Sequence, residues 1–171
     1  MAHEYPNQFA RIGVSDADVR AKVEATFNTI FFDAEDGFYR EVDADSSCME
    51  DTGNHDARTE GMSYGMMMAV QMDRQDIFDK LWTFACRYML LREGRHEGYF
   101  AWSVQLDGKH NAEGPAPDGE EYFAMALFMV GYCTTVGFAV YYMKYVFGNE
   151  GLYVVLVGVC GVAQLSALGV Y

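Results

Sequence analysis

The charged residues of this chain stop abruptly at Glu121, and this feature constrains its folding more than any other. The first 121 residues carry 11 Lys and Arg and 24 Asp and Glu, whereas the last fifty carry only Lys144 and Glu150. The formal net charge of -13 therefore lies entirely in the first part. Charged side chains stay at the surface and long apolar stretches must be covered. We therefore expect two segments, an acidic domain at residues 1–128 and an apolar tail at residues 129–171.

The acidic charge limits the partners of the chain. Such a field repels phosphate backbones, and no run of Lys and Arg forms a local basic patch. The composition excludes nucleic acid as a partner and leaves sugars and other neutral polymers. The four cysteines form no CxxC pair and have no histidine at metal-ligand spacing, so we expect reduced thiols, no metal and no cofactor. The N-terminus has neither a basic start nor an apolar run, which indicates a cytoplasmic chain without a signal peptide.

Helical periodicity marks three segments of the acidic part. Residues 15–32 open with Ser15 and Asp18 at the spacing of a capping box and repeat apolar residues every four positions, which predicts an amphipathic helix. Residues 59–72 are dense in Met and small residues, a composition typical of a buried helix. Residues 75–91 place apolar side chains on one face. The last two segments are predicted to form antiparallel helices joined by a short polar turn.

Two stretches between these helices and the tail are predicted as loops. Residues 33–56 are acidic and contain Gly and Ser, which favours a long loop with little regular structure. Residues 93–121 are rich in Gly and Pro, which favours a loop with short extended pieces. The second loop ends in Pro-Asp-Gly-Glu-Glu before the apolar residues 122–128, so we expect it to deliver acidic side chains to the start of a helix.

The apolar tail is compatible with three interpretations. Its two apolar spans of about 20 residues, separated by residues 148–151, are long enough to cross a bilayer as a helical hairpin. Lys144 is the single basic residue of the tail, however, so the positive-inside signal is nearly absent. In the second interpretation the tail is a buried core segment. In the third it is foreign to the preceding domain, for example because of a reading-frame change in the gene. Contact with a membrane is expected only through residues 129–171.

Two carboxylates are candidates for chemistry. Glu60 and Asp118 each lie at a predicted loop-to-helix junction, precede a glycine and neighbour aromatic residues, among them Tyr64 and Tyr122. Two carboxylates across a sugar are the minimum equipment for hydrolysis of a glycosidic bond. Ordinary helix caps occupy the same positions, and a helix N-terminus favours an anion whereas a general acid must keep its proton. Trp102, in the loop between them, is either a platform for a sugar ring or an ordinary loop aromatic.

Two strings of residues carry a family likeness. Residues 56–66 (DARTEGMSYGM) and 116–127 (APDGEEYFAMAL) resemble the two N-terminal motifs of glycoside hydrolase family eight, and residues 36–39 and 99–103 support them. The likeness covers about residues 5–128. It is strongest to those members of the family that release xylose from the reducing end of xylo-oligosaccharides.

This resemblance implies an all-α fold, the (α/α)6 barrel, and inverting hydrolysis of β-1,4-linked xylo-oligosaccharides. It gives Glu60 the role of general acid and Asp118 that of a carboxylate that orients the sugar, with Tyr64, Trp102 and Tyr122 as substrate contacts. The family's catalytic base matches no position of this chain. Twelve barrel helices with their connections need roughly 300 residues or more.

We therefore expect only the N-terminal helices of an incomplete barrel, followed by the apolar tail, and an impaired activity. The alternative function is a membrane-anchored acidic module that binds carbohydrate without cleaving it.

Overall fold

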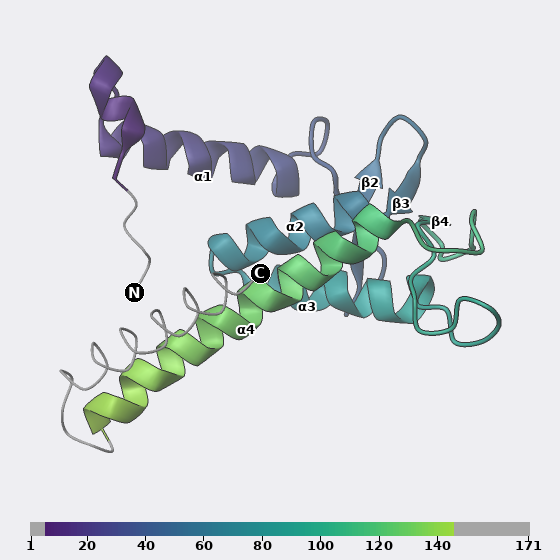
Figure 1. Ribbon diagram of the computed structural model, residues 1–171. Coiled ribbons are helices and arrows are strands. Elements are labelled where there is room, and N and C mark those ends of the chain that lie inside the picture. The colour runs from purple at the N-terminus through teal and green to yellow at the C-terminus, as the bar shows by residue number, and fades with distance from the viewer. Residues whose placement is uncertain (1–5, 146–171) are drawn as a thin grey trace. The chain divides into compact units, whose positions relative to one another are not determined.

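The computed structural model describes residues 6–145, while residues 1–5 and 146–171 lie outside the described residues (Figure 1). The chain forms two compact units, one of residues 2–129 and one that holds residues 130–171, and each is described by itself. The elements in chain order are a 3-10 helix Gln8–Ile12, α1 Asp16–Phe32, β1 Tyr39–Glu41, β2 Ser47–Asp51, β3 Asp56–Arg58, α2 Thr59–Gln71, α3 Gln75–Phe84, a π-helical turn Ala85–Met89, β4 Ser103–Gln105 and α4 Pro117–Tyr145.

The first predicted helix is confirmed as α1, and its start is set by local hydrogen bonds. The Asp18 amide donates to Ser15 Oγ at 3.2 Å, and the Ser15 amide donates back to the Asp18 carboxylate. Phe27 and Phe31 are buried, with ring centroids 4.3 Å apart, whereas Val23 is 50% exposed. The predicted apolar stripe is therefore buried over its C-terminal half.

The two predicted antiparallel helices are confirmed as α2 and α3, which pack against each other (Figure 1). Asp73, in the turn between them, adopts a left-handed φ of 56°. The core of this pair consists of the fully buried side chains of Met62, Met66, Ala69, Leu81 and Phe84. The buried strand β2 packs on both helices and closes this core.

The prediction of a loop over residues 33–56 is wrong, because β1, β2 and the start of β3 lie there. Together with β4 they form a four-stranded antiparallel sheet in the order β1-β2-β3-β4. The fold is mostly helical, but this sheet is missing from the all-α prediction. Three of the strands have only three residues. Strands this short have too few residues for a clear alternation of polar and apolar side chains, and β3 pairs with a strand far along the chain.

The short extended piece predicted within residues 93–121 is confirmed as β4, and the helix predicted after it as α4. This helix continues beyond the acidic part, through the start of the tail to Tyr145. Within residues 6–145, none of the helices combines the length and apolar character needed to span a membrane. The second apolar span of the predicted hairpin lies in residues 146–171, outside the described residues.

Candidate active site

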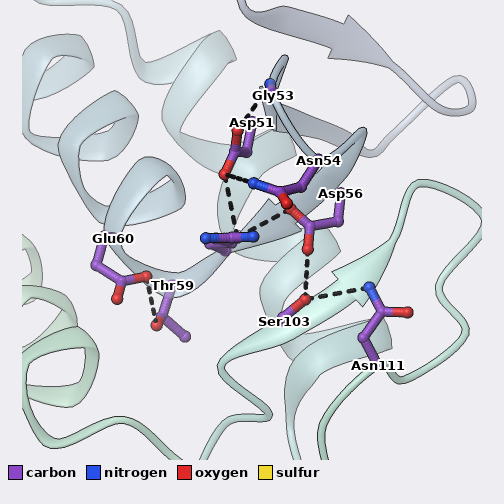
Figure 2. A network of polar contacts seen from close by, with 9 residues as sticks. Asp51, Gly53, Asn54, Asp56, Thr59, Glu60, Ser103 and Asn111 are labelled. Carbon is purple, nitrogen blue, oxygen red and sulfur yellow. Dashed lines mark hydrogen bonds and ion pairs between the residues drawn. The ribbon is translucent and has the colours of Figure 1, made fainter.

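Glu60 lies in the first turn of α2, directly after a strand. β3 ends at Arg58, and α2 begins at Thr59 without a side-chain cap. The Thr59 amide, one of the donors that a helix start leaves without a helical partner, donates instead to the Trp102 carbonyl at 3.1 Å. The Thr59 hydroxyl donates to Glu60 Oε2 at 3.3 Å (Figure 2). Thr59 is fully buried and Glu60 half-buried, so the carboxylate is hydrogen-bonded to a buried residue and remains partly accessible to solvent.

Asp118 lies in the first turn of α4, at the predicted junction. Pro117 occupies the first helical position, where its missing N–H costs nothing. The next residue after Asp118, Gly119, is buried against α2, because a Cβ built there would lie 2.6 Å from Thr59 Cβ and collide with Thr59 Oγ1. The first turns of α2 and α4 therefore touch, and the structure brings the two predicted carboxylates to neighbouring helix starts.

Tyr64 and Tyr122 each lie four residues after one of these carboxylates and meet each other. Their ring centroids are 5.0 Å apart, with an edge-to-face angle of 64°. The pKa of Tyr64 is raised, first by its hydrogen bond with Tyr122, then by desolvation and by electrostatic interactions with Tyr122, Glu60 and Asp118. Tyr64 is therefore within the electrostatic reach of both carboxylates, and its hydroxyl stays a neutral donor at neutral pH.

Trp102 joins the same region through its main chain and its ring. Its carbonyl accepts the Thr59 amide, as described above, and its amide donates to the Gly114 carbonyl at 3.1 Å. Trp102 is 37% exposed. All five residues predicted for the site, the two carboxylates and three aromatics, thus lie around the first turns of α2 and α4.

A polar network around Arg58, the residue directly before Thr59, was missed by sequence reasoning (Figure 2). Arg58 Nε lies 3.0 Å from Asp56 Oδ1 and 3.2 Å from Asp51 Oδ2. The hydrogen bond with Asp56 is the main reason why the pKa of Arg58 is raised. The Ser103 hydroxyl donates to the other oxygen of Asp56 at 2.7 Å. Asp56 and Arg58 are two positions apart, as residues on one face of a strand are, but that signal is visible only once β3 is recognised.

Glu120 is a second missed residue. The Phe100 amide donates to Glu120 Oε1 at 2.7 Å, which ties the loop of Trp102 to the start of α4. The Phe100 ring also packs on Phe123 of α4, with centroids 4.7 Å apart. Among residues 6–145, no group of three His, Cys, Asp or Glu side chains could hold a metal ion.

Comparison with known proteins matches most of the acidic part of the chain to one family. The profile of Glycosyl hydrolases family 8 matches residues 32–134. The chain belongs to this family. The reducing end xylose-releasing exo-oligoxylanase of Halalkalibacterium halodurans is 55% identical over 130 residues, which are 75% of this chain and 34% of that protein. The chain thus spans about a third of the length of the curated relatives it matches.

Solved structures show the same likeness in three dimensions. A crystal structure of a reducing-end-xylose releasing exo-oligoxylanase matches with a TM-score of 0.70 and 56% identity, over 74% of this chain and 33% of that chain. The Paenibacillus barcinonensis relative, complexed with xylose, matches with a TM-score of 0.70 and 52% identity, over 73% of this chain and 33% of that chain. The family 8 likeness predicted from the two motifs is confirmed.

Proposed function

We propose that this chain serves the inverting hydrolysis of β-1,4-linked xylo-oligosaccharides, with release of xylose from the reducing end. The observation that carries the proposal is the contact between Gly119 and Thr59, because it sets Glu60 and Asp118 at adjacent helix starts. The names of the relatives support the substrate class. Two related structures are complexed with xylose, and variants of two relatives are complexed with xylobiose and with an arabinofuranosyl-xylotetraose.

In this proposal Glu60 is the general acid. Its carboxyl proton passes to the glycosidic oxygen as the bond from that oxygen to the anomeric carbon breaks, so the leaving sugar departs as a neutral alcohol. The hydrogen bond from Thr59 engages one carboxyl oxygen of Glu60 and restrains its rotation. Asp118 orients the sugar next to the cleaved bond by accepting hydrogen bonds from its hydroxyl groups. Tyr64 is a neutral donor at the same place.

Inverting hydrolysis also requires a base that takes a proton from the attacking water, with roughly 6.5–9.5 Å between the two carboxyl groups. No position of the 171 residues matches that base of the family. A proton transfer of this kind contributes roughly 10²–10⁴-fold to the rate. We therefore propose that these 171 residues alone hydrolyse xylo-oligosaccharides only feebly.

The experiment compares the 171-residue chain with its Glu60→Gln, Asp118→Asn and Glu97→Gln variants on xylotriose, with xylose quantified by chromatography. Glu97 is an exposed loop carboxylate and serves as the control. We expect a slow release that Glu60→Gln lowers by roughly 10²-fold or more and Glu97→Gln leaves unchanged. Asp118→Asn should weaken xylotriose binding measured by calorimetry, whereas Glu60→Gln should retain it.

Sodium azide separates a missing base from a missing acid. Azide attacks the anomeric carbon without first losing a proton, so it needs no base, and xylotriose then yields xylobiosyl azide and free xylose. We expect azide to speed cleavage by the parent chain and not by Glu60→Gln. Rapid release without azide would refute the proposed impairment. Failure of the parent chain to bind xylotriose would refute the proposed function.

A further inference from the structure

The side chain of Arg58 lies over the ring of Trp102. Its guanidinium carbon is 5.3 Å from the ring centroid, a distance at which a cation is attracted to an aromatic face. Arg58 is directly opposite Ser103 in the β3–β4 register, so the arginine and the residue that follows Trp102 are cross-strand partners. Trp102 as a whole is still 37% exposed. One part of Trp102 is therefore covered by protein and another is open to a ligand.

One buried carboxylate holds both parts of this arrangement. Asp56 Oδ1 accepts from Arg58 Nε at 3.0 Å, and Asp56 Oδ2 accepts from the Ser103 hydroxyl at 2.7 Å (Figure 2). Ser103 Oγ also accepts from Asn111 Nδ2 at 3.1 Å, which fixes the hydroxyl further. Asp56 thus restrains the ring of Trp102 through Arg58 and its main chain through Ser103.

Asp51 adds a second restraint on the arginine. Its Oδ2 lies 3.2 Å from Arg58 Nε, and the carboxylate is itself held in a tight turn by the Gly53 amide and the Asn54 side chain. A long arginine side chain has many rotamers, and contacts with two carboxylates that are themselves hydrogen-bonded restrict this freedom. A ring that is already held in place costs less to order when a ligand stacks on it.

We propose that Asp56 and Arg58 are positioning residues that hold Trp102 as a platform for a xylose ring beside Glu60. The inference rests on the proposed function for the identity of the ligand. The restraint of Trp102 by Asp56 and Arg58 is a property of the free protein and is testable without any sugar.

The test uses the full chain with Trp82→Phe, since Trp102 is then the sole tryptophan. In this background Arg58→Met removes the charge and keeps the length of the side chain, and Arg58→Lys keeps the charge. Asp56→Asn weakens the hydrogen bonds from Arg58 and Ser103 to residue 56. Arg40→Met is the matched control. Arg40 lies on the same sheet, pairs with Glu50 at 2.6 Å and has a side-chain exposure of 33% against 30% for Arg58.

Two readouts are taken on each variant. Acrylamide quenching of Trp102 in the free protein should increase about twofold in Arg58→Met and Asp56→Asn, and xylotriose affinity, followed by Trp102 emission, should fall about fivefold. Arg58→Lys should change quenching and xylotriose affinity less than Arg58→Met does, and Arg40→Met should change neither quantity. A merely structural role would change the melting temperature without changing the quenching of Trp102.

The outcomes distinguish the inference from the proposed function. Unchanged quenching and affinity in Arg58→Met would overturn the inference, and so would equal effects of Arg58→Met and Arg40→Met. A parent that fails to bind xylotriose would refute the proposed function, while the quenching data would still decide the role of Asp56 and Arg58. If Asp56→Asn fails to fold, Arg58→Met and Arg58→Lys, at a partly exposed position, decide the question.

Discussion

The first turns of α2 and α4 each present a carboxylate, but they are supported in different ways. α2 continues directly from the sheet, and its first residue, Thr59, is fully buried and hydrogen-bonded to the loop of Trp102. α4 follows a loop, and Asp118 at its start is exposed. Its position depends on the contact between Gly119 and Thr59 and on the hydrogen bond from Phe100 to Glu120. The proposed acid is thus anchored by the sheet, whereas the proposed orienting carboxylate is anchored by one glycine and one neighbouring carboxylate.

This difference suits the two proposed roles. A proton donor must meet one oxygen atom with precise geometry, so it gains from a rigid and partly buried support. A carboxylate that accepts hydrogen bonds from sugar hydroxyls must stay accessible. Disturbing the start of α4 should therefore affect Asp118 more than Glu60, and the following variants test that expectation.

Gly119→Ala should have the largest effect, because the new Cβ would collide with the buried Thr59 side chain. Overpacking of this kind typically costs about 1–3 kcal/mol, and the better helix propensity of Ala offsets less than about 1 kcal/mol of it. Urea denaturation should show the lower free energy of unfolding. The double variant Thr59→Ala with Gly119→Ala removes Thr59 Oγ1 and keeps the Cβ of residue 59, so it should recover only part of the loss. A Gly119→Ala chain as stable as the parent would show that the two helix starts are not in contact.

Glu120→Gln should have a smaller effect, about 0.5–1.5 kcal/mol, because a neutral acceptor replaces a charged one opposite the Phe100 amide. Hydrogen exchange of that amide should accelerate, while exchange of the Thr59 amide at the start of α2 should stay unchanged. Glu121→Gln, at the exposed neighbouring position, is the control and should leave both amides as they are. Equal acceleration at Thr59 would mean that the two helix starts are not supported separately.

Lowering the pH should have the smallest effect. It should reduce the contribution of the Glu50 contacts on β2 to the free energy of unfolding by less than about 1 kcal/mol. The pKa of Glu50 on β2 lies below its ordinary value of 4.5, chiefly because His55 hydrogen-bonds to its carboxylate and, to a lesser extent, because Arg40 does. The stabilisation is therefore complete above the ordinary pKa and is lost as the pH falls through the lower folded-state value. Thermal unfolding measured between about pH 6 and pH 3 should show a shallower decline in Glu50→Gln than in the parent.

Glu24→Gln, at an exposed position of α1, provides the control for this titration. Its stability should follow the parent curve. A Glu50→Gln curve that also follows the parent would show that the ion pair with Arg40 and the contact with His55 do not stabilise the sheet.

The helices were predictable because local signals specify them. The capping box of α1 and the apolar face of α3 are contained within a few turns of chain, and both were found in place. The sheet was not predictable in the same way. β1 and β2 lie in an acidic stretch with turn-forming residues, and β3 is completed by β4, whose partners at Arg58 and Ser103 are distant in sequence. Pairing over such a separation depends on the packed fold and not on local propensity.

The candidate site, like the fold, could be predicted only in part from the sequence. Glu60 and Asp118 could be selected from residue type, the following glycine and the neighbouring aromatics. The closeness of the two carboxylates could not be predicted, because it depends on Gly119 lying against Thr59. Asp56 and Arg58 belong to the first family motif, but their role could not be predicted, because it depends on the arginine lying over the ring of Trp102.

The amino-acid sequence alone determined the family, the helices of the acidic part and the two carboxylates, since each of these is encoded by a short run of neighbouring residues. Only the tertiary structure decided that the two carboxylates start adjacent helices and that a buried aspartate and an arginine support Trp102. These contacts join residues of β3 and α2 to residues about 45 to 60 positions later in the chain. Local patterns cannot specify such contacts, because they form only when packing brings the sheet and both helix starts together.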